Sequence, residues 1–158
     1  MFLPTLRFQL KNTRKNFMKL AIKQAAKSLG LSEVPVGCVI VDGNGKIISS
    51  GHNASIKNND PTLHAEIMAI RKACKKRKNI KLLDCSLYVT LQPCRMCEAA
   101  IFETGIKRVY FGSYSDSFRN FSDLKKKYHK ELNGFIYYGG IEEEECTSML
   151  KGFFKKLR

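Results

Sequence analysis

The sequence predicts an α/β fold, in which helices cover both faces of a single sheet. Stretches with strand and helix patterns alternate along its 158 residues, and apolar residues make up 44% of them, enough for a core. No internal repeat and no linker rich in Gly, Ser or Pro divides the chain. The length is that of one ordinary domain, so we expect a single one.

The first third of the chain predicts a helix followed by a hairpin. Residues 13–29 carry apolar side chains at helical spacing. Residues 36–41 form an apolar run that is too short for a helix and rich in Val and Ile, which is typical of a buried strand. The turn sequence Asp-Gly-Asn-Gly at residues 42–45 then leads to a second strand at residues 46–52, so the two strands are expected to pair antiparallel.

Helices and strands continue to alternate in the remainder of the chain. A helix is expected to open with Asp60 as the N-cap and Pro61 at the first helical position. Its predicted inward stripe is Leu63, Ile67, Ile70 and Cys74. The later elements are expected to be strands at residues 86–90, 107–112 and 134–138, and helices at residues 93–103 and 141–157. Residues 113–133 are polar and basic, and we expect them to form a long connection.

The charge of the chain is strongly positive. Lys and Arg number 28 against 14 Asp and Glu, which gives a formal net charge of +14. Such a charge favours a polyanionic partner, with nucleic acid first and an anionic membrane surface second, although a solvated lysine-rich surface would look the same. No apolar run approaches the roughly 20 residues of a membrane span. No secretory signal is recognisable, so we expect a cytoplasmic protein without a membrane partner.

The cysteines and one histidine indicate a metal site. Of six cysteines, only Cys94 and Cys97 have metal-site spacing. Cysteines three apart on a helix share a face, and His64 lies at the start of another predicted helix. Thiolate and imidazole are ligands that zinc prefers, and three protein ligands leave one position for water, as in catalytic sites. Glu66, two residues past His64, could then move protons.

The remaining cysteines bear on whether the metal site is catalytic or purely structural. Three of them lie within apolar patterns and are expected to be buried: Cys38, Cys74 and Cys146. A closed, purely structural zinc site would need a fourth ligand. Cys85, His52 and His129 are the candidates for it.

His-x-Glu followed by Pro-Cys-x-x-Cys is the signature of zinc nucleobase deaminases. Beyond these motifs, the sequence resembles the bacterial tRNA-specific adenosine deaminases from about Met18 to Arg158. The matching stretches are residues 33–37, 51–53, 60–69, 87–97, 108–112, 140–141, 146 and 153–158. We therefore expect residues 18–158 to form the deaminase domain, with residues 1–17 either an N-terminal extension or the start of the first helix.

The resemblance implies a specific fold and reaction. The fold would be a three-layer α/β/α sandwich with a central five-stranded mixed sheet, assembled as a homodimer. The reaction would be hydrolysis of the wobble adenosine of a tRNA anticodon stem-loop to inosine. One zinc ion per chain would be held by His64, Cys94 and Cys97, with Glu66 as the catalytic proton shuttle.

The same resemblance implies four substrate contacts. Asn53 would hydrogen-bond the target base, and the backbone around Ala65 would contact the reacting centre. Phe153 and Phe154, which are followed by cations, would contact RNA. Core packing is the other reading of the two phenylalanines, at most one of which can easily face inward.

Two departures from the family pattern bear on substrate recognition. Gln92 stands where the family usually has Glu, and Ser115 stands where it usually has Asp, with Asp116 one residue later. Two other functions are therefore kept open: deamination of a free guanine- or cytosine-type base, and a non-catalytic zinc-containing RNA-binding module. Glu66 speaks against the second, because metal binding alone does not require it.

Overall fold

A five-stranded mixed sheet forms the centre of the protein in the computed structural model, which describes residues 4–115 and 134–157. The strand order is β2-β1-β3-β4-β5. The strands are β1 (Gly37–Val41), β2 (Ile47–His52), β3 (Ser86–Leu91), β4 (Arg108–Ser113) and β5 (Ile136–Tyr138). β1 pairs antiparallel with β2 and β3, whereas β4 pairs parallel with β3 and β5. The predicted mixed sheet and hairpin are confirmed.

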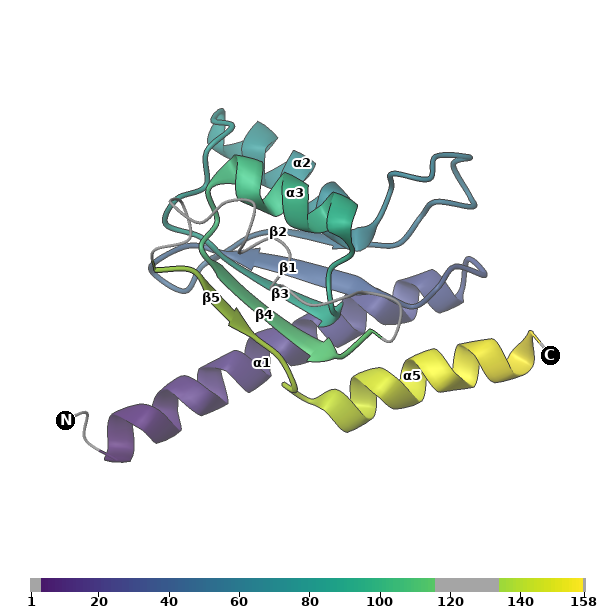
Figure 1. The fold of residues 1–158 in the computed structure, drawn as a ribbon, viewed down its shortest axis with the longest axis horizontal. Coiled ribbons are helices and arrows are strands. Elements are labelled where there is room, and N and C mark those ends of the chain that lie inside the picture. Colours follow the sequence, from purple (N-terminus) through teal and green to yellow (C-terminus); the bar gives the residue numbers. More distant parts are fainter. Residues whose placement is uncertain (1–3, 116–133, 158) are drawn as a thin grey trace.

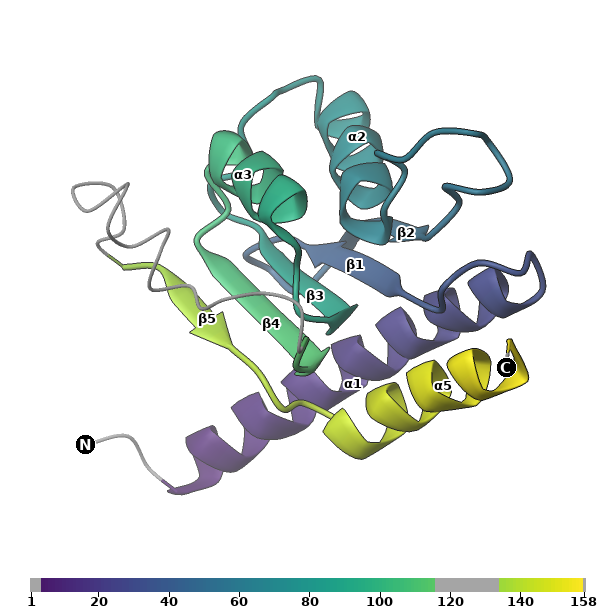
Figure 2. The same ribbon diagram turned by 45° about the vertical axis from the view of Figure 1, so that its right-hand side comes forward.

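Helices cover both faces of this sheet. α2 (Ala65–Arg77) and α3 (Arg95–Thr104) lie on one face, and α1 (Pro4–Leu29) and α5 (Glu143–Lys156) lie on the other (Figures 1 and 2). Alternate residues of β1 divide between the two cores: Cys38 and Ile40 pack on the α2 side, while Val39 and Val41 pack with α1. The three-layer α/β/α architecture is therefore confirmed.

Two glycines let the helices lie close to the sheet. A Cβ added at Gly37 would lie 2.0 Å from the carbonyl oxygen of Ala21 in α1. One added at Gly51 would lie 2.3 Å from the carbonyl oxygen of Ala65 in α2. Because real Cβ atoms do not approach so closely, a side chain at Gly51 would push the start of α2 away from the sheet.

The predicted start and inward stripe of the second helix were wrong. α2 begins at Ala65, because Asp60 accepts hydrogen bonds from the backbone and hydroxyl of Thr62, at 2.8 and 2.6 Å, and forms a separate turn. Its buried residues are Ala65, Glu66, Ala69, Ile70 and Ala73. Of the predicted stripe only Ile70 is fully buried, since the small alanines allow the close approach at Gly51.

The other elements differ from the predictions mainly at their ends. α1 begins at Pro4, nine residues before the expected start, and α5 begins at Glu143. Of the cysteines expected in the core, Cys38 and Cys146 are buried and Cys74 is partly buried. Most of the predicted long connection, residues 116–133, lies outside the described residues. Among the helices that are described, none is long and apolar enough to cross a membrane.

Candidate metal centre and active site

Two helices begin at the same point of the molecule. His64 is the N-cap residue of α2 and Cys94 is the N-cap residue of α3, and both have extended backbone. Cys97 lies in the first turn of α3. The N-terminus of a helix carries partial positive charge, so two such ends favour thiolate and carboxylate groups between them.

The ligand atoms of His64, Cys94 and Cys97 have the spacing that zinc requires. They all lie within 4.8 Å of one another, and the Nδ1 atom of His64 is 3.5 Å from each Sγ atom. In tetrahedral zinc sites, bond lengths of about 2.1 Å to nitrogen and 2.3 Å to sulfur place those two atoms about 3.6 Å apart. The three side chains therefore fit one zinc ion.

Residues 4–115 and 134–157 provide no fourth ligand for a closed structural zinc site. The only candidate ligand group in these segments is His64, Cys94 and Cys97. The Nδ1 atom of His52 instead contacts the backbone oxygen of Asn53, at 3.0 Å. His129 lies outside the described residues. An open coordination position is the feature that distinguishes catalytic from structural zinc sites.

The ligands influence one another's ionisation in the protein without metal. A hydrogen bond from Cys97, followed by one from His64, lowers the pKa of the Cys94 thiol to about 4. The same contact with Cys94, together with burial, raises the pKa of Cys97. The hydrogen bond to Cys94 also raises the pKa of His64. These shifts favour a thiolate at Cys94, and a bound cation would favour a second one at Cys97.

Glu66 is a buried carboxyl group beside these ligands. It lies in the first turn of α2, and only 3% of its surface is exposed. Burial, and then the negative charge of Cys94, raises the pKa of Glu66 to about 7. A group that titrates near neutral pH can both accept and return a proton, which is what a general acid–base catalyst needs.

Asn53 connects the start of α2 to the end of α1. Its Oδ1 atom accepts a hydrogen bond from the Ala65 N–H, at 3.1 Å, and its backbone oxygen accepts one from the Ser28 hydroxyl, at 3.2 Å. These bonds fix Asn53 next to His64. They also occupy the N–H of Ala65, so a predicted substrate contact of the Ala65 backbone would have to use another atom.

Comparison with known proteins agrees with this geometry. Residues 11–113 match the family described as the cytidine and deoxycytidylate deaminase zinc-binding region. A tRNA-specific adenosine deaminase of Haemophilus influenzae is 41% identical over 148 residues, which cover 89% of this chain and 83% of the relative. The chain belongs to the zinc-binding cytidine and deoxycytidylate deaminase family. The predicted zinc cofactor is thereby confirmed.

Two solved deaminase structures are similar to this chain. One comes from studies of A-to-I editing by tRNA:A34 deaminases at the wobble position of transfer RNA. It has a TM-score of 0.77 and 34% identity, and the match covers 85% of this chain and 99% of that one. The other is a guanine deaminase from Bacillus subtilis, with a TM-score of 0.59 and 36% identity, covering 77% of this chain and 69% of that one.

A hydrogen-bond network behind the deaminase site was missed from the sequence. The Tyr137 hydroxyl donates to the Glu98 carboxylate, at 2.9 Å, and also has a hydrogen bond with Gln92. The Oε1 atom of Gln92 accepts from the backbone N–H of Ser115, at 3.1 Å. The two departures from the family pattern, Gln92 and Ser115, are thus in direct contact. The one indication of this network in the sequence was that Gln92 and Glu98 lie next to the cysteine motif.

The two predicted RNA-contacting aromatics lie near the end of α5. Phe153 is partly buried and Phe154 is 49% exposed, with their rings edge to face at 5.3 Å between centroids. Phe154 lines a cavity of about 460 Å³ together with Tyr114 and Lys155. An exposed aromatic ring beside a lysine is suited to stacking on a base next to a phosphate.

Proposed function

We propose that this chain hydrolyses the wobble adenosine of a tRNA anticodon loop to inosine, releasing ammonia. The observation that carries the proposal is the juxtaposition of a zinc-fitting His64–Cys94–Cys97 group with the buried carboxyl group of Glu66. The similarity to tRNA-specific adenosine deaminases supports the choice of substrate.

In this proposal each residue of the centre has one role. His64, Cys94 and Cys97 would hold the zinc ion, which when bound lowers the pKa of water toward neutrality and so supplies the attacking nucleophile. Glu66 would take up the two protons of that water in turn and deliver one to the ring nitrogen and the other to the leaving amine. Burial raises the pKa of this carboxyl group above its ordinary value, which favours its protonated form between the two transfers.

Recognition would come from groups around the centre. Asn53 would use its Nδ2 amide on the base edge, because its Oδ1 atom is held by Ala65. The backbone around Ala65 would contact the reacting centre. Phe153 and Phe154 would contact bases of the loop. An anticodon loop presents unpaired bases, so no duplex has to be opened.

A second candidate is deamination of a free base, which the 36% identity to the Bacillus guanine deaminase favours. We place it second because that match covers 69% of the guanine deaminase, compared with 99% of the tRNA deaminase chain, and has the lower TM-score. A free base would also leave the net charge of +14 without a role.

One experiment separates the two candidates. The purified protein is incubated with an anticodon stem-loop RNA containing a wobble adenosine and, separately, with free guanine, cytosine and adenine. We expect inosine in the RNA and little or no turnover of the free bases, with Glu66→Gln as the inactive control. Faster turnover of a free base than of the loop adenosine would overturn the tRNA assignment and leave the zinc chemistry in place.

The resemblance also leads us to propose a homodimer and a cytoplasmic location. Sedimentation of the purified protein measures the first, and a mass of one chain would contradict it. Cell fractionation measures the second.

A further inference from the structure

The lysines of α1 form a regular row. Lysines occur at every fourth position, and all of these side chains are exposed: Lys11, Lys15, Lys19, Lys23 and Lys27. No acidic residue occurs anywhere in this helix. Four residues of α-helix rise about 6 Å, so successive lysines lie at nearly the spacing of neighbouring phosphates along one nucleic-acid strand.

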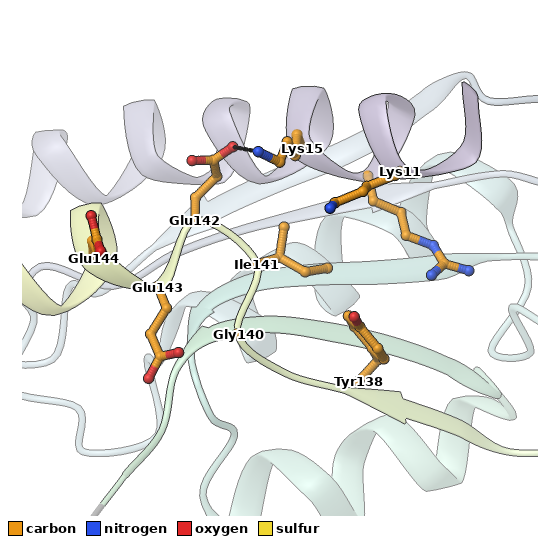
Figure 3. Close-up of a pocket in the computed structure, with 9 residues that line it drawn as sticks. Lys11, Lys15, Tyr138, Gly140, Ile141, Glu142, Glu143 and Glu144 are labelled. Carbon is orange, nitrogen blue, oxygen red and sulfur yellow. Dashed lines mark ion pairs between the residues drawn. The ribbon is translucent and has the colours of Figure 1, made fainter. Parts of the chain in front are cut away.

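The two ends of the row have different surroundings. At the N-terminal end, Lys11 and Lys15 border a cavity whose other side carries the acids that open α5 (Figure 3). Lys15 pairs there with Glu142, at 3.6 Å. The positive charge of this end is therefore partly neutralised within the molecule, and the free part of the row begins at Lys19.

At the C-terminal end the row reaches the proposed substrate site. Lys27 precedes Ser28, whose hydroxyl donates to the backbone oxygen of Asn53. Asn53 in turn binds the first N–H of α2, next to His64. An RNA strand with one base at Asn53 would therefore pass the end of α1, and the two lysines before Lys27 lie within about 12 Å of it along the helix axis.

The buried face of α1 leaves these side chains directed outward. The helix packs on the sheet through Met18, Ala21 and Ile22, and Ala25 is buried next to Gly37 of β1. Successive residues of an α-helix are rotated by about 100°, which places Lys19, Lys23 and Lys27 on the side of the helix away from that face. The α1 helix crosses one face of the sheet beside α5 (Figures 1 and 2), and the three lysine side chains are exposed there.

From these observations we propose that Lys19, Lys23 and Lys27 form a contact surface for the RNA phosphate backbone outside the base pocket. The inference rests on the proposed tRNA substrate and adds a second attachment to it, separate from α5. Its role is docking, so it affects binding and leaves the chemical step unchanged.

The test compares two variants of equal charge. One is Lys19→Gln, Lys23→Gln, Lys27→Gln. The control is Lys46→Gln, Lys75→Gln, Lys107→Gln, three exposed lysines at the far end of the sheet, in the β1–β2 turn, late in α2 and before β4. Binding of a fluorescent tRNA is measured between about 0.05 and 0.3 M salt, where each phosphate contact contributes about 0.7–0.9 to the log–log slope.

We expect the α1 variant to lower the salt slope by about 2 to 3 and to weaken binding roughly 10- to 100-fold at physiological salt. The control should keep the wild-type slope, and both variants should keep wild-type kcat at saturating RNA. A slope equal to that of the control would overturn the proposal. So would loss of affinity for phosphatidylserine vesicles with unchanged RNA binding, because the row would then be a membrane surface.

The binding assay separates this inference from the proposed function. If the wild-type protein binds tRNA but forms no inosine, the proposed reaction fails while the slopes still decide the role of α1. If the wild-type protein forms inosine and the slopes coincide, the reaction stands and the surface is rejected.

Discussion

The metal centre and the surface around it are built in opposite ways. At the centre, Glu66 and Cys97 are buried, and every ligand is attached to the start of a helix that packs on the sheet. At the surface, Phe154 and the α1 lysines are exposed and contact few fixed partners. Chemistry therefore depends on side chains that cannot move, whereas recognition depends on side chains that can be exchanged without disturbing the fold.

The largest effect that follows from this difference is at Glu66. Glu66→Gln keeps the size of the side chain and removes its proton transfer, so kcat should fall by at least about 10²–10⁴-fold. Zinc content, measured by elemental analysis, should stay at one ion per chain. A variant that retains a tenth of the wild-type rate would show that another group moves the protons.

The burial of Glu66 should also appear in the stability of the zinc-free protein. Its pKa rises from 4.5 to about 7 on folding, so the folded protein holds the proton more tightly than the unfolded chain does. This contribution is complete below pH 4.5 and is lost as the pH rises through 7. The difference in unfolding free energy between wild type and Glu66→Gln should therefore change by about 3 kcal/mol over that range, in the direction that favours wild type at low pH.

Urea denaturation of both chelated proteins at several pH values measures that difference. Taking the difference cancels the titration of shared groups that do not interact with Glu66. An equal pH dependence in the two proteins would mean that Glu66 is as well solvated in the folded state as in the unfolded chain.

Zinc removal should have the next largest effect. An ion present at 100 times its Kd stabilises the folded state by about 2.7 kcal/mol, which for a chain of this length is roughly 5–11 °C in Tm. Chelation should lower Tm by that amount in the wild type and leave the Cys94→Ser, Cys97→Ser variant unchanged. Undiminished zinc in this double variant would contradict the ligand assignment.

The same difference explains which features the sequence could predict. Local patterns were sufficient for the hairpin, whose turn is fixed by Asp42, and for the spacing of Cys94 and Cys97 on one helix. His64 is 30 residues from Cys94, and the deaminase signature joined it to the two cysteines. The fold class and the five strands were also predicted correctly.

Contacts between distant segments could not be predicted in this way. Tyr137 and Glu98 are 39 residues apart, and no local pattern pairs them. The start of α2 was misplaced because Asp60 and Pro61 suit a turn as well as a helix start, and Gly51, 9 residues before Asp60, decides how the helix packs. Periodicity alone also failed to show that alanines would form the buried face of α2.

At the surface, the substitution Phe154→Ala should affect only macromolecular substrates. A base stacked on an aromatic ring contributes about 1–3 kcal/mol, so KM for the RNA stem-loop should rise by roughly 5- to 150-fold at constant kcat. Ile80→Ala, at a residue that is 75% exposed in the segment between α2 and β3, is the control. A matching loss on free adenosine would place Phe154 in the pocket and not on the RNA.

The smallest effect is expected where the two regions meet, at the contact between Gln92 and Ser115. Gln92 accepts from the backbone N–H of Ser115, so Ser115→Asp leaves this bond in place and puts a carboxylate on the side chain. If a carboxylate at this position binds a ribose hydroxyl, Ser115→Asp should raise the ratio of RNA to DNA stem-loop turnover by about 3- to 10-fold, the value of one hydrogen bond. Zinc content and Tm should not change.

Asp116 is one residue further on and offers the same chemistry, so the two positions must be compared. If Asp116 already binds the ribose, Ser115→Asp will leave the RNA to DNA ratio unchanged and Asp116→Ala will lower it. The double variant Gln92→Glu, Ser115→Asp measures whether the effects of the two positions on the RNA to DNA ratio are coupled. Gln92→Glu puts a second carboxylate at the Tyr137 hydroxyl, which already donates to Glu98, and the two carboxylates repel each other, so the double variant should gain less than the single one. Strict additivity would mean that the two substituted positions, although in contact, act on the substrate independently.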